Sequence, residues 1–318
     1  MSASLSERAR EWLSRRLAEP QPPLVAVEVR ERSVGVVRLV RERGRLALGA
    51  AASLELSPGV VKPSLIQPNL VDPEAFQRAL RSSLERAGVM AGGRAALVLP
   101  DPVARLVLIP AGELKARSAR ETEELLRFRL RKTVPFEIGE ARLAWLRAPA
   151  REGGSLLVAV ARNSVIDEYE SSCRAAGLHA GIVEVAALAL ASAAFDGASS
   201  EDRLLVNWDE GYVSLVLARG EWPLLVRTLA DEAAADPEQV AREVANTLLY
   251  HSERLAGREL SAVALRSAAL PAHEAVAVLR EAAGVEPQVV DPWRLFGAEG
   301  GGWGSPMVAA GSSLARAV

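Results

Sequence analysis

The chain carries the sequence LVAVEVRERSVGVVRLV over residues 24–40 and LLVNWDEGYVSLVLARGEWPLLVRTL over residues 204–229. Both stretches alternate short apolar runs with polar turns, a pattern typical of strands joined by tight hairpins. The turns fall at matching places, Arg30-Glu31-Arg32 in the first stretch and Asp209-Glu210-Gly211 in the second. Because the two copies lie about 180 residues apart, they predict one supersecondary unit used twice. The expected strands are 24–29, 34–40 and a third from Leu46, and then 204–206, 213–217 and 223–229.

The segments that follow each meander also correspond. Asp72-Pro73-Glu74 and Asp236-Pro237-Glu238 each place an N-cap residue before a proline at the first helical position. Apolar residues at helical spacing follow in both halves, and then a short apolar strand, at 95–99 and at 262–265. Each half therefore predicts three strands, a helix, a strand and a helix. We expect an α/β fold that is duplicated, with a mixed sheet in each half.

Extra material lies in the first half, and we expect a small αβ subdomain to be inserted at about residues 104–185. Ser118 and Glu121 have the spacing of a capping box that opens a helix, and Val134-Pro135 ends that helix. The predicted organisation is a first half of residues 24–199, which contains the insertion, and a second half of residues 200–318.

Residues 1–23 precede the first half and form a unit of their own. Charged residues interrupt the apolar residues of this segment, and this pattern argues against a signal peptide. The apolar residues fall on one stripe of a helix. We expect an amphipathic helix followed by a Pro-rich spacer, Pro20-Gln21-Pro22-Pro23. Two interpretations are open: a helix docked on its own domain, or a helix that binds a partner or a membrane surface. The apolar stripe is Leu5, Ala9, Trp12, Leu13 and Leu17.

The composition excludes several classes of protein. The 318 residues include 38 Lys plus Arg and 40 Asp plus Glu, a formal net charge of -2, which argues against a nucleic-acid-binding protein. The single cysteine, Cys173, excludes an internal disulfide and a thiolate metal cluster, and the three histidines are too far apart for a metal site. No apolar run is long enough to span a bilayer. We therefore expect a cytoplasmic protein without metal.

Several segments resemble the PilM family of type IV pilus assembly proteins, in one order and over roughly residues 24–316. The resemblance also extends to the cytoplasmic part of the type II secretion protein GspL. It implies an actin-like ATPase fold of the FtsA branch, in which a small subdomain is inserted in the first half. The segments are 99–102 (LPDP), 134–136 (VPF), 157–161 (LVAVA), 176–178 (AGL), 183–185 (VEV), 248–265 and 289–292 (VVDP).

The resemblance also implies partners and a place in the cell. A PilM-like protein docks on the N-terminal cytoplasmic tail of a PilN-like bitopic inner-membrane protein, in a groove that involves the inserted subdomain. This chain would then lie in the cytoplasm at the inner face of the bacterial inner membrane, peripheral to it, together with other pilus or secretion platform components. An extended tail laid on a folded surface suits a partner with little cytoplasmic mass. The resemblance does not identify the residues of that groove.

The chain departs from the family where nucleotide chemistry would occur. The family sequence Asp-Ile-Gly-Ser-Ser-Ser-Val-Lys falls on residues 28–35, where Glu28 replaces the Asp and Arg30 the Gly. The second phosphate turn falls on Asn207-Trp208-Asp209, and the Gly-rich adenosine loop on residues 265–269. Since phosphates need close approach of backbone N–H groups, the lost glycines predict degenerate loops. If a nucleotide did bind, the candidate residues would be Glu28, Ser33, Asn207, Asp209 and Ser267.

We therefore expect a non-catalytic scaffold, a pseudo-ATPase without catalytic residues, cofactor or metal. The alternative is an ATP-binding actin-like ATPase of the same fold, for which ATP and magnesium would be the cofactors. A third hypothesis, a sugar-kinase-type phosphotransferase, needs a catalytic Asp after a phosphate loop, and we find none. No lysine follows a Gly-rich loop, and Gly300-Gly301-Gly302 lies in a predicted connector. His251 and Cys173 are expected to be structural.

The proline spacer makes the role of the N-terminal helix testable. Deletion of residues 1–20 should leave unfolding cooperative and the melting temperature nearly unchanged, because the spacer separates this segment from the first strand. Thermal unfolding followed by circular dichroism measures both quantities. A truncated protein that does not fold would instead place Trp12 and Leu13 in the core.

Overall fold

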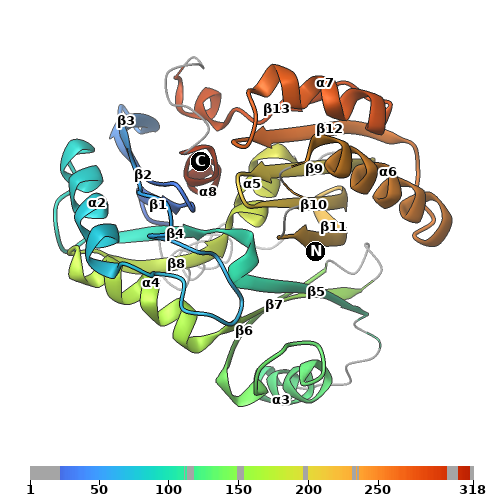
Figure 1. The fold of residues 1–318 in the computed structure, drawn as a ribbon, viewed down its shortest axis with the longest axis horizontal. Coiled ribbons are helices and arrows are strands. Elements are labelled where there is room, and N and C mark those ends of the chain that lie inside the picture. The colour runs from blue at the N-terminus through green and yellow to red at the C-terminus, as the bar shows by residue number, and fades with distance from the viewer. Residues whose placement is uncertain are drawn as a thin grey trace, which may run out of the picture.

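The two halves of the chain form two five-stranded mixed sheets with the same strand order. In each sheet the three strands of the meander are antiparallel, and two further strands run parallel to the first strand of the meander. The predicted duplication is confirmed by this match in order and direction (Figure 1). The first sheet is β3 (Arg45–Glu55), β2 (Ser33–Glu42), β1 (Val25–Val29), β4 (Arg94–Leu99) and β8 (His179–Val185). The second is β11 (Trp222–Leu229), β10 (Tyr212–Arg219), β9 (Asp202–Asp209), β12 (Leu260–Ser267) and β13 (Pro287–Val289).

The structure is a computed structural model. It describes residues 22–110, 112, 118–148, 154–195, 200–230, 234, 236–298 and 307–315. The predicted N-terminal helix, the first two residues of the proline spacer and the Gly300–Gly302 connector lie outside the described residues.

The helices of the two halves also correspond. α2 (Pro73–Arg86) follows the first meander and α6 (Pro237–Arg254) follows the second. Asp72 accepts a hydrogen bond from the backbone N–H of Ala75 at 2.9 Å, and Asp236 accepts one from Glu238 at 3.0 Å. Both predicted N-caps are therefore confirmed. The matching second helices are α4 (Asn163–Ala175) and α7 (Ala272–Ala283).

The insertion forms a third sheet of its own. Its antiparallel strands are β5 (Ala104–Pro110), β7 (Ser155–Arg162) and β6 (Ala141–Arg147), in that order, and α3 (Ala119–Leu130) packs on one face. Ser118 accepts a hydrogen bond from Glu121 N–H at 3.1 Å, as the capping box predicts. The sheet accounts for residues 104–162 of the expected 104–185, whereas β8 pairs with β4 in the first sheet.

Two short helices join the halves. α5 (Ala186–Ala194) and α8 (Val308–Leu314) lie against each other between the sheets (Figure 1). One apolar cluster contains residues of α5 and α8 together with Val98 of β4 and Leu205 of β9. Three 3-10 turns complete the described elements: Asp101–Val103, Ile138–Glu140 and Pro292–Phe296. Among the described helices, none is both long and apolar enough to cross a membrane.

Candidate functional site

The hairpin turns of the two halves face each other across the cleft between the sheets. The turn after β1 carries Arg30 and Glu31, and the turn after β9 carries Glu210 and Gly211. Gly211 lies directly against Glu31, since a Cβ atom on this glycine would be 2.6 Å from Glu31 Oε2. Each turn lies at the carboxyl end of a strand that runs parallel to one of its neighbours, β4 for β1 and β12 for β9, and this is the edge where α/β sheets bind ligands.

Arg266, at the end of β12, connects the two halves inside this cleft. Its Nη2 donates to Glu28 Oε1 of the first half at 2.7 Å, and its Nη1 donates to Asp209 Oδ2 of the second half at 2.5 Å. All three side chains are almost completely buried. A guanidinium with two carboxylate partners is a charge-assisted contact of the strong kind.

Arg30 forms a second connection between the halves. Its Nε lies 3.1 Å from both carboxylate oxygens of Asp209, and its Nη2 donates to Asp209 Oδ1 at 2.8 Å. The Arg30 side chain comes from the first hairpin turn and Asp209 from the second, so this pair joins the two turns directly. Asp209 therefore accepts from two buried arginines, and Tyr212 Oη donates a further bond at 3.3 Å.

Hydrogen bonds extend this cluster to the helices that join the halves. Arg266 Nη1 donates to Asn207 Oδ1 at 3.1 Å, and Asn207 Nδ2 donates to Asp101 Oδ2 at 2.8 Å. The other oxygen of Asp101 accepts from the N–H of Ala187, in the first turn of α5, at 2.7 Å. In the same way Glu28 Oε2 accepts from the N–H of Ala310 in α8 at 2.8 Å.

The cluster holds its carboxyl groups at different acidities. Burial opposes ionisation of Asp209, but the charges of Arg266 and Arg30 outweigh it and hold the pKa below its ordinary value. Burial dominates at Glu28 and raises its pKa to about 7, although Arg266 and the N–H of Ala310 favour the ionised form. Burial also raises the pKa of Asp101. Asp209 is thus the permanent counter-ion of the two arginines.

Three of the five predicted candidates, Glu28, Asn207 and Asp209, come together in this cluster. Ser33 lies at its margin, with its Oγ 3.5 Å from Arg30 Nη1. Ser267 is not part of it, because its hydroxyl donates instead to the carbonyl of Leu270 at 2.7 Å.

Arg30, Arg266 and Asp101 were not predicted as members of the cluster. The sequence places both arginines in loops that have lost the glycines of the family. The opposite charges of the two equivalent hairpin turns, Arg30 in one and Asp209 in the other, were the signal that could have indicated pairing.

The cleft does not fit a magnesium nucleotide. The arginine side chains point at carboxylates of the protein where a phosphate cradle would present bare backbone N–H groups. The polar cavity outside the turns, of about 670 Å³, has the carboxylates of Glu31, Glu55 and Glu210 on its wall together with Arg30 and Arg32. Arg30 is already bonded to Asp209, and the three carboxylates repel polyphosphate. No group of metal-ligating side chains occurs among the described residues.

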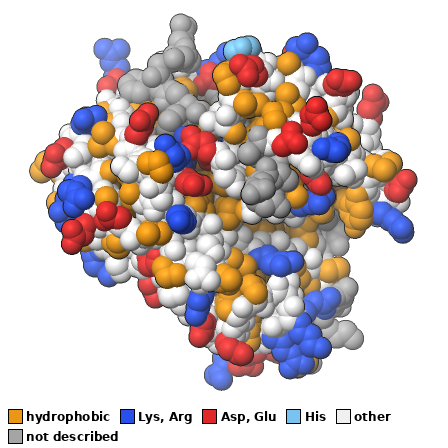
Figure 2. All heavy atoms as spheres, in the orientation of Figure 1, with side chains coloured by type: hydrophobic (Ala, Val, Ile, Leu, Met, Phe, Trp, Pro, Cys, Tyr) orange, Lys and Arg blue, Asp and Glu red, His pale blue; other side chains and the backbone are white. Residues whose placement is uncertain are grey.

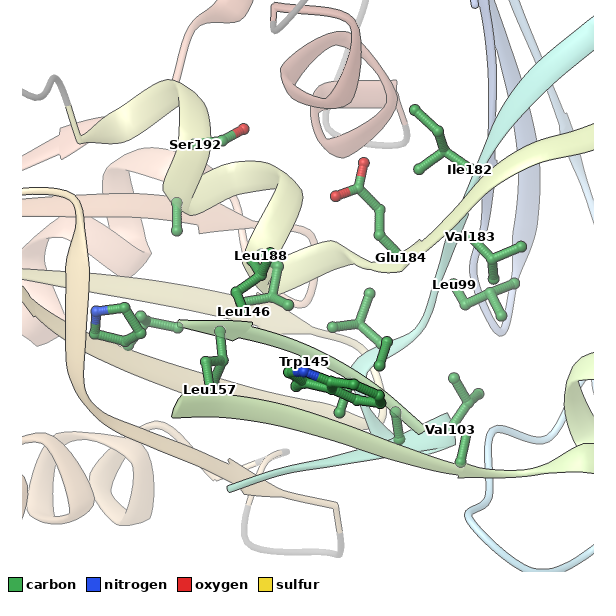
Figure 3. A pocket seen from close by; sticks show the side chains of 18 of the residues that line it. Leu99, Val103, Trp145, Leu146, Leu157, Ile182, Val183, Glu184, Leu188 and Ser192 are labelled. Atoms are coloured by element: carbon green, nitrogen blue, oxygen red, sulfur yellow. The ribbon is translucent and has the colours of Figure 1, made fainter. Parts of the chain in front are cut away.

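A larger apolar groove lies between the inserted subdomain and the rest of the molecule. Its volume is about 750 Å³, and it is bounded by the three-stranded sheet, by β8 and α5, and by β10 and β11 of the second half. Figure 2 shows hydrophobic side chains gathered where the subdomain meets the body of the molecule, and Figure 3 shows Trp145, Leu157 and Leu188 around the groove.

Small side chains explain why this groove is open. On the face of the three-stranded sheet opposite α3, alanines 104, 144, 159 and 161 line the groove. An alanine leaves space where a larger apolar residue would fill the gap to α5. Trp222 of β11 holds the second half against this sheet, since its Nε1 donates to Ser155 Oγ at 2.6 Å. The groove is therefore framed by contacts between all three sheets.

Solved structures show which fold this is. A chain of the PilM-PilN type IV pilus biogenesis complex superposes with a TM-score of 0.74 at 21% identity, over 94% of this chain and 97% of that chain. The fold is that of a PilM-like protein. A Bacteroides thetaiotaomicron protein with an actin-like ATPase fold and unknown function gives 0.50 at 9% identity, over 86% of this chain and 92% of that one.

A third structure is the cytoplasmic domain of EpsL, an inner-membrane component of the Vibrio cholerae type II secretion system. It gives a TM-score of 0.48 at 11% identity, over 78% of this chain and 82% of that chain. No protein-family model matches the sequence, and no curated protein is similar to it in sequence. The PilM-like, actin-like fold predicted from the sequence is confirmed by the structural comparison.

The raised pKa of Glu28 predicts a pH dependence of stability. The folded protein keeps this proton up to about pH 7, whereas the unfolded chain releases it near 4.5. Between these values the folded state binds the extra proton, so the free energy of unfolding falls as pH rises, by on the order of 3 kcal/mol. Glu28→Gln removes the titration and keeps the shape of the protonated form. Relative to wild type, the variant should therefore gain stability as pH rises from about 5 to about 8.

Urea unfolding of both proteins at the two pH values measures this difference. Glu74→Gln, at an exposed position on α2, is the matched control and should follow wild type at both. If wild type and Glu28→Gln differ by the same free energy at both pH values, Glu28 does not titrate in this window.

Proposed function

We propose that this protein is a non-catalytic scaffold of a type IV pilus or type II secretion assembly platform at the inner membrane. It docks on the N-terminal cytoplasmic tail of a PilN-like bitopic membrane protein. It works in the cytoplasm, peripheral to the membrane and beside other components of the platform, and it needs no cofactor. The observation that carries the proposal is an open apolar groove beside a cleft that is filled by charged side chains.

The groove has the properties of a peptide-docking site. Its wall is apolar, it is fixed by three sheets, and it lies between the inserted subdomain and the first half. Arg142, the one basic residue among the described residues that line the groove, has Asp167 and Glu170 as ion-pair partners at 2.8 and 2.6 Å. The groove therefore favours apolar side chains over an anionic ligand. A fold shared over the full chain with a protein solved as a PilM-PilN complex supports a tail of that kind as occupant.

The filled cleft supports a scaffold rather than an ATPase. A buried ion-pair cluster loses several kcal/mol if one partner is withdrawn, so a nucleotide would have to displace bonds that the protein already makes. The acidic wall of the outer cavity opposes a polyphosphate as well. Since the arginines of the cleft are already bonded to carboxylates of the protein, none of the residues in the cleft is assigned a catalytic role.

The first test is binding of the tail. A synthetic peptide that copies the N-terminal cytoplasmic tail of the bitopic membrane protein encoded beside this one should bind at micromolar affinity, about −8 kcal/mol. Ala159→Phe directs a large ring into the groove and should abolish binding, whereas Leu249→Ala, at an exposed position on α6, should leave it unchanged. Isothermal titration calorimetry measures the affinity, and thermal unfolding checks that each variant folds.

An absence of heat and of any shift in melting temperature with the wild-type protein would remove the main support for the scaffold. Equal affinity of wild type and Ala159→Phe for the peptide would show that the tail binds outside this groove.

The second test is the response to nucleotide. A ligand present at a hundred times its dissociation constant stabilises a protein by about 2.7 kcal/mol. Because the arginines occupy the phosphate turns, millimolar magnesium-ATP should leave the melting temperature where magnesium chloride alone leaves it. The purified protein should also carry no nucleotide. A shift of several degrees, or ATP hydrolysis that is lost when Glu28 or Asn207 is changed, would favour the ATPase alternative.

A further inference from the structure

The strands around the groove contribute their side chains in two different ways. β7 contributes Leu157, Ala159 and Ala161, and β10 contributes Val216 and Ala218, every second residue in both strands. β8 contributes four consecutive residues, Ile182 to Val185. Successive side chains of a strand point to opposite faces of its sheet. The groove therefore meets β7 and β10 on a face, and it meets β8 along its edge.

The position of β8 in its sheet agrees with this reading. Among the described strands, β8 is the last of the first sheet, and its only strand neighbour is β4. In β4 the residues from Ala95 to Leu99 are all buried, whereas in β8 those from Ala180 to Glu184 are only half-buried. A strand edge of this kind offers main-chain hydrogen bonds to another extended chain.

Packing on both faces holds β8 in place. Val183 and Val185 belong to the core cluster of the first half, and Ile182 packs with the cluster that contains α8. On that same face the Glu184 carboxylate accepts a hydrogen bond from Ser313 of α8 at 2.5 Å. With both faces anchored, the edge is a rigid wall of the groove, which lowers the entropic cost of pairing with it.

We infer that the docking segment binds as an added strand along β8 and extends the first sheet by one strand. This inference rests on the proposed function and specifies how the tail is recognised. The main chain of the tail hydrogen-bonds to β8, and every second side chain faces the alanine floor of the three-stranded sheet. The structure thus assigns a partner segment of at least four extended residues, with apolar side chains at alternate positions.

Hydrogen exchange measured by NMR on the full-length protein tests the pairing. When the tail peptide is added, amides at alternate positions of residues 181–186 should exchange at least tenfold more slowly, while those of β6 should keep their rates. A strand that pairs on one more side gains bonds at every second residue only.

A scan of N-methylated tail peptides tests the same pairing through changes in the peptide. Methyl groups that block N–H groups facing β8 should weaken binding at least tenfold, and those at the intervening positions serve as matched controls with little effect. Tail binding without this two-residue period, or protection on β6 alone, overturns the β8 pairing and leaves the docking proposal standing. A tail that does not bind at all overturns both.

Discussion

The buried guanidinium of Arg266 is the constraint on which the arrangement of the two halves depends. A charge removed from water must be compensated inside the protein. Here Asp209 of the second half supplies the counter-charge, and Glu28 of the first half accepts a hydrogen bond from the same guanidinium. Arg30 adds a second bond across the same cleft. The halves are thus held together by side chains of the chain itself, at the position where an actin-like ATPase would hold its nucleotide.

The same cluster reaches the groove. Asp101 connects Asn207 to the first turn of α5, and α5 forms one wall of the groove. Residues on either side of Asp101, Leu99 and Val103, line the groove as well. The cleft and the groove are therefore supported by one continuous set of buried hydrogen bonds.

The fold could be predicted because its signals are local. Turn residues at matching places, and caps such as Asp72 and Asp236, depend on neighbours within a few positions along the chain. The cluster could be predicted only in part, since the bond from Arg266 to Glu28 joins residues 238 positions apart. The resemblance implied a groove at the inserted subdomain, but the residues of the groove could not be identified from the sequence. It results from alanines on one sheet face, and an alanine in a strand gives no indication of what lies opposite.

A double-mutant cycle on Arg30 and Asp209 tests most directly whether these ion pairs hold the halves together. Arg30→Met and Asp209→Leu should each cost about 3 kcal/mol or more in the free energy of unfolding, because each withdraws one partner from a buried ion-pair cluster. The double variant should lose at least about 1.5 kcal/mol less than the sum of the two. The same cycle on the exposed pair of Arg120 and Glu124 is the reference, and its coupling energy should be near zero. If the loss of the double variant equals the sum of the two single losses to within about 0.5 kcal/mol, the ion pair does not hold the halves together.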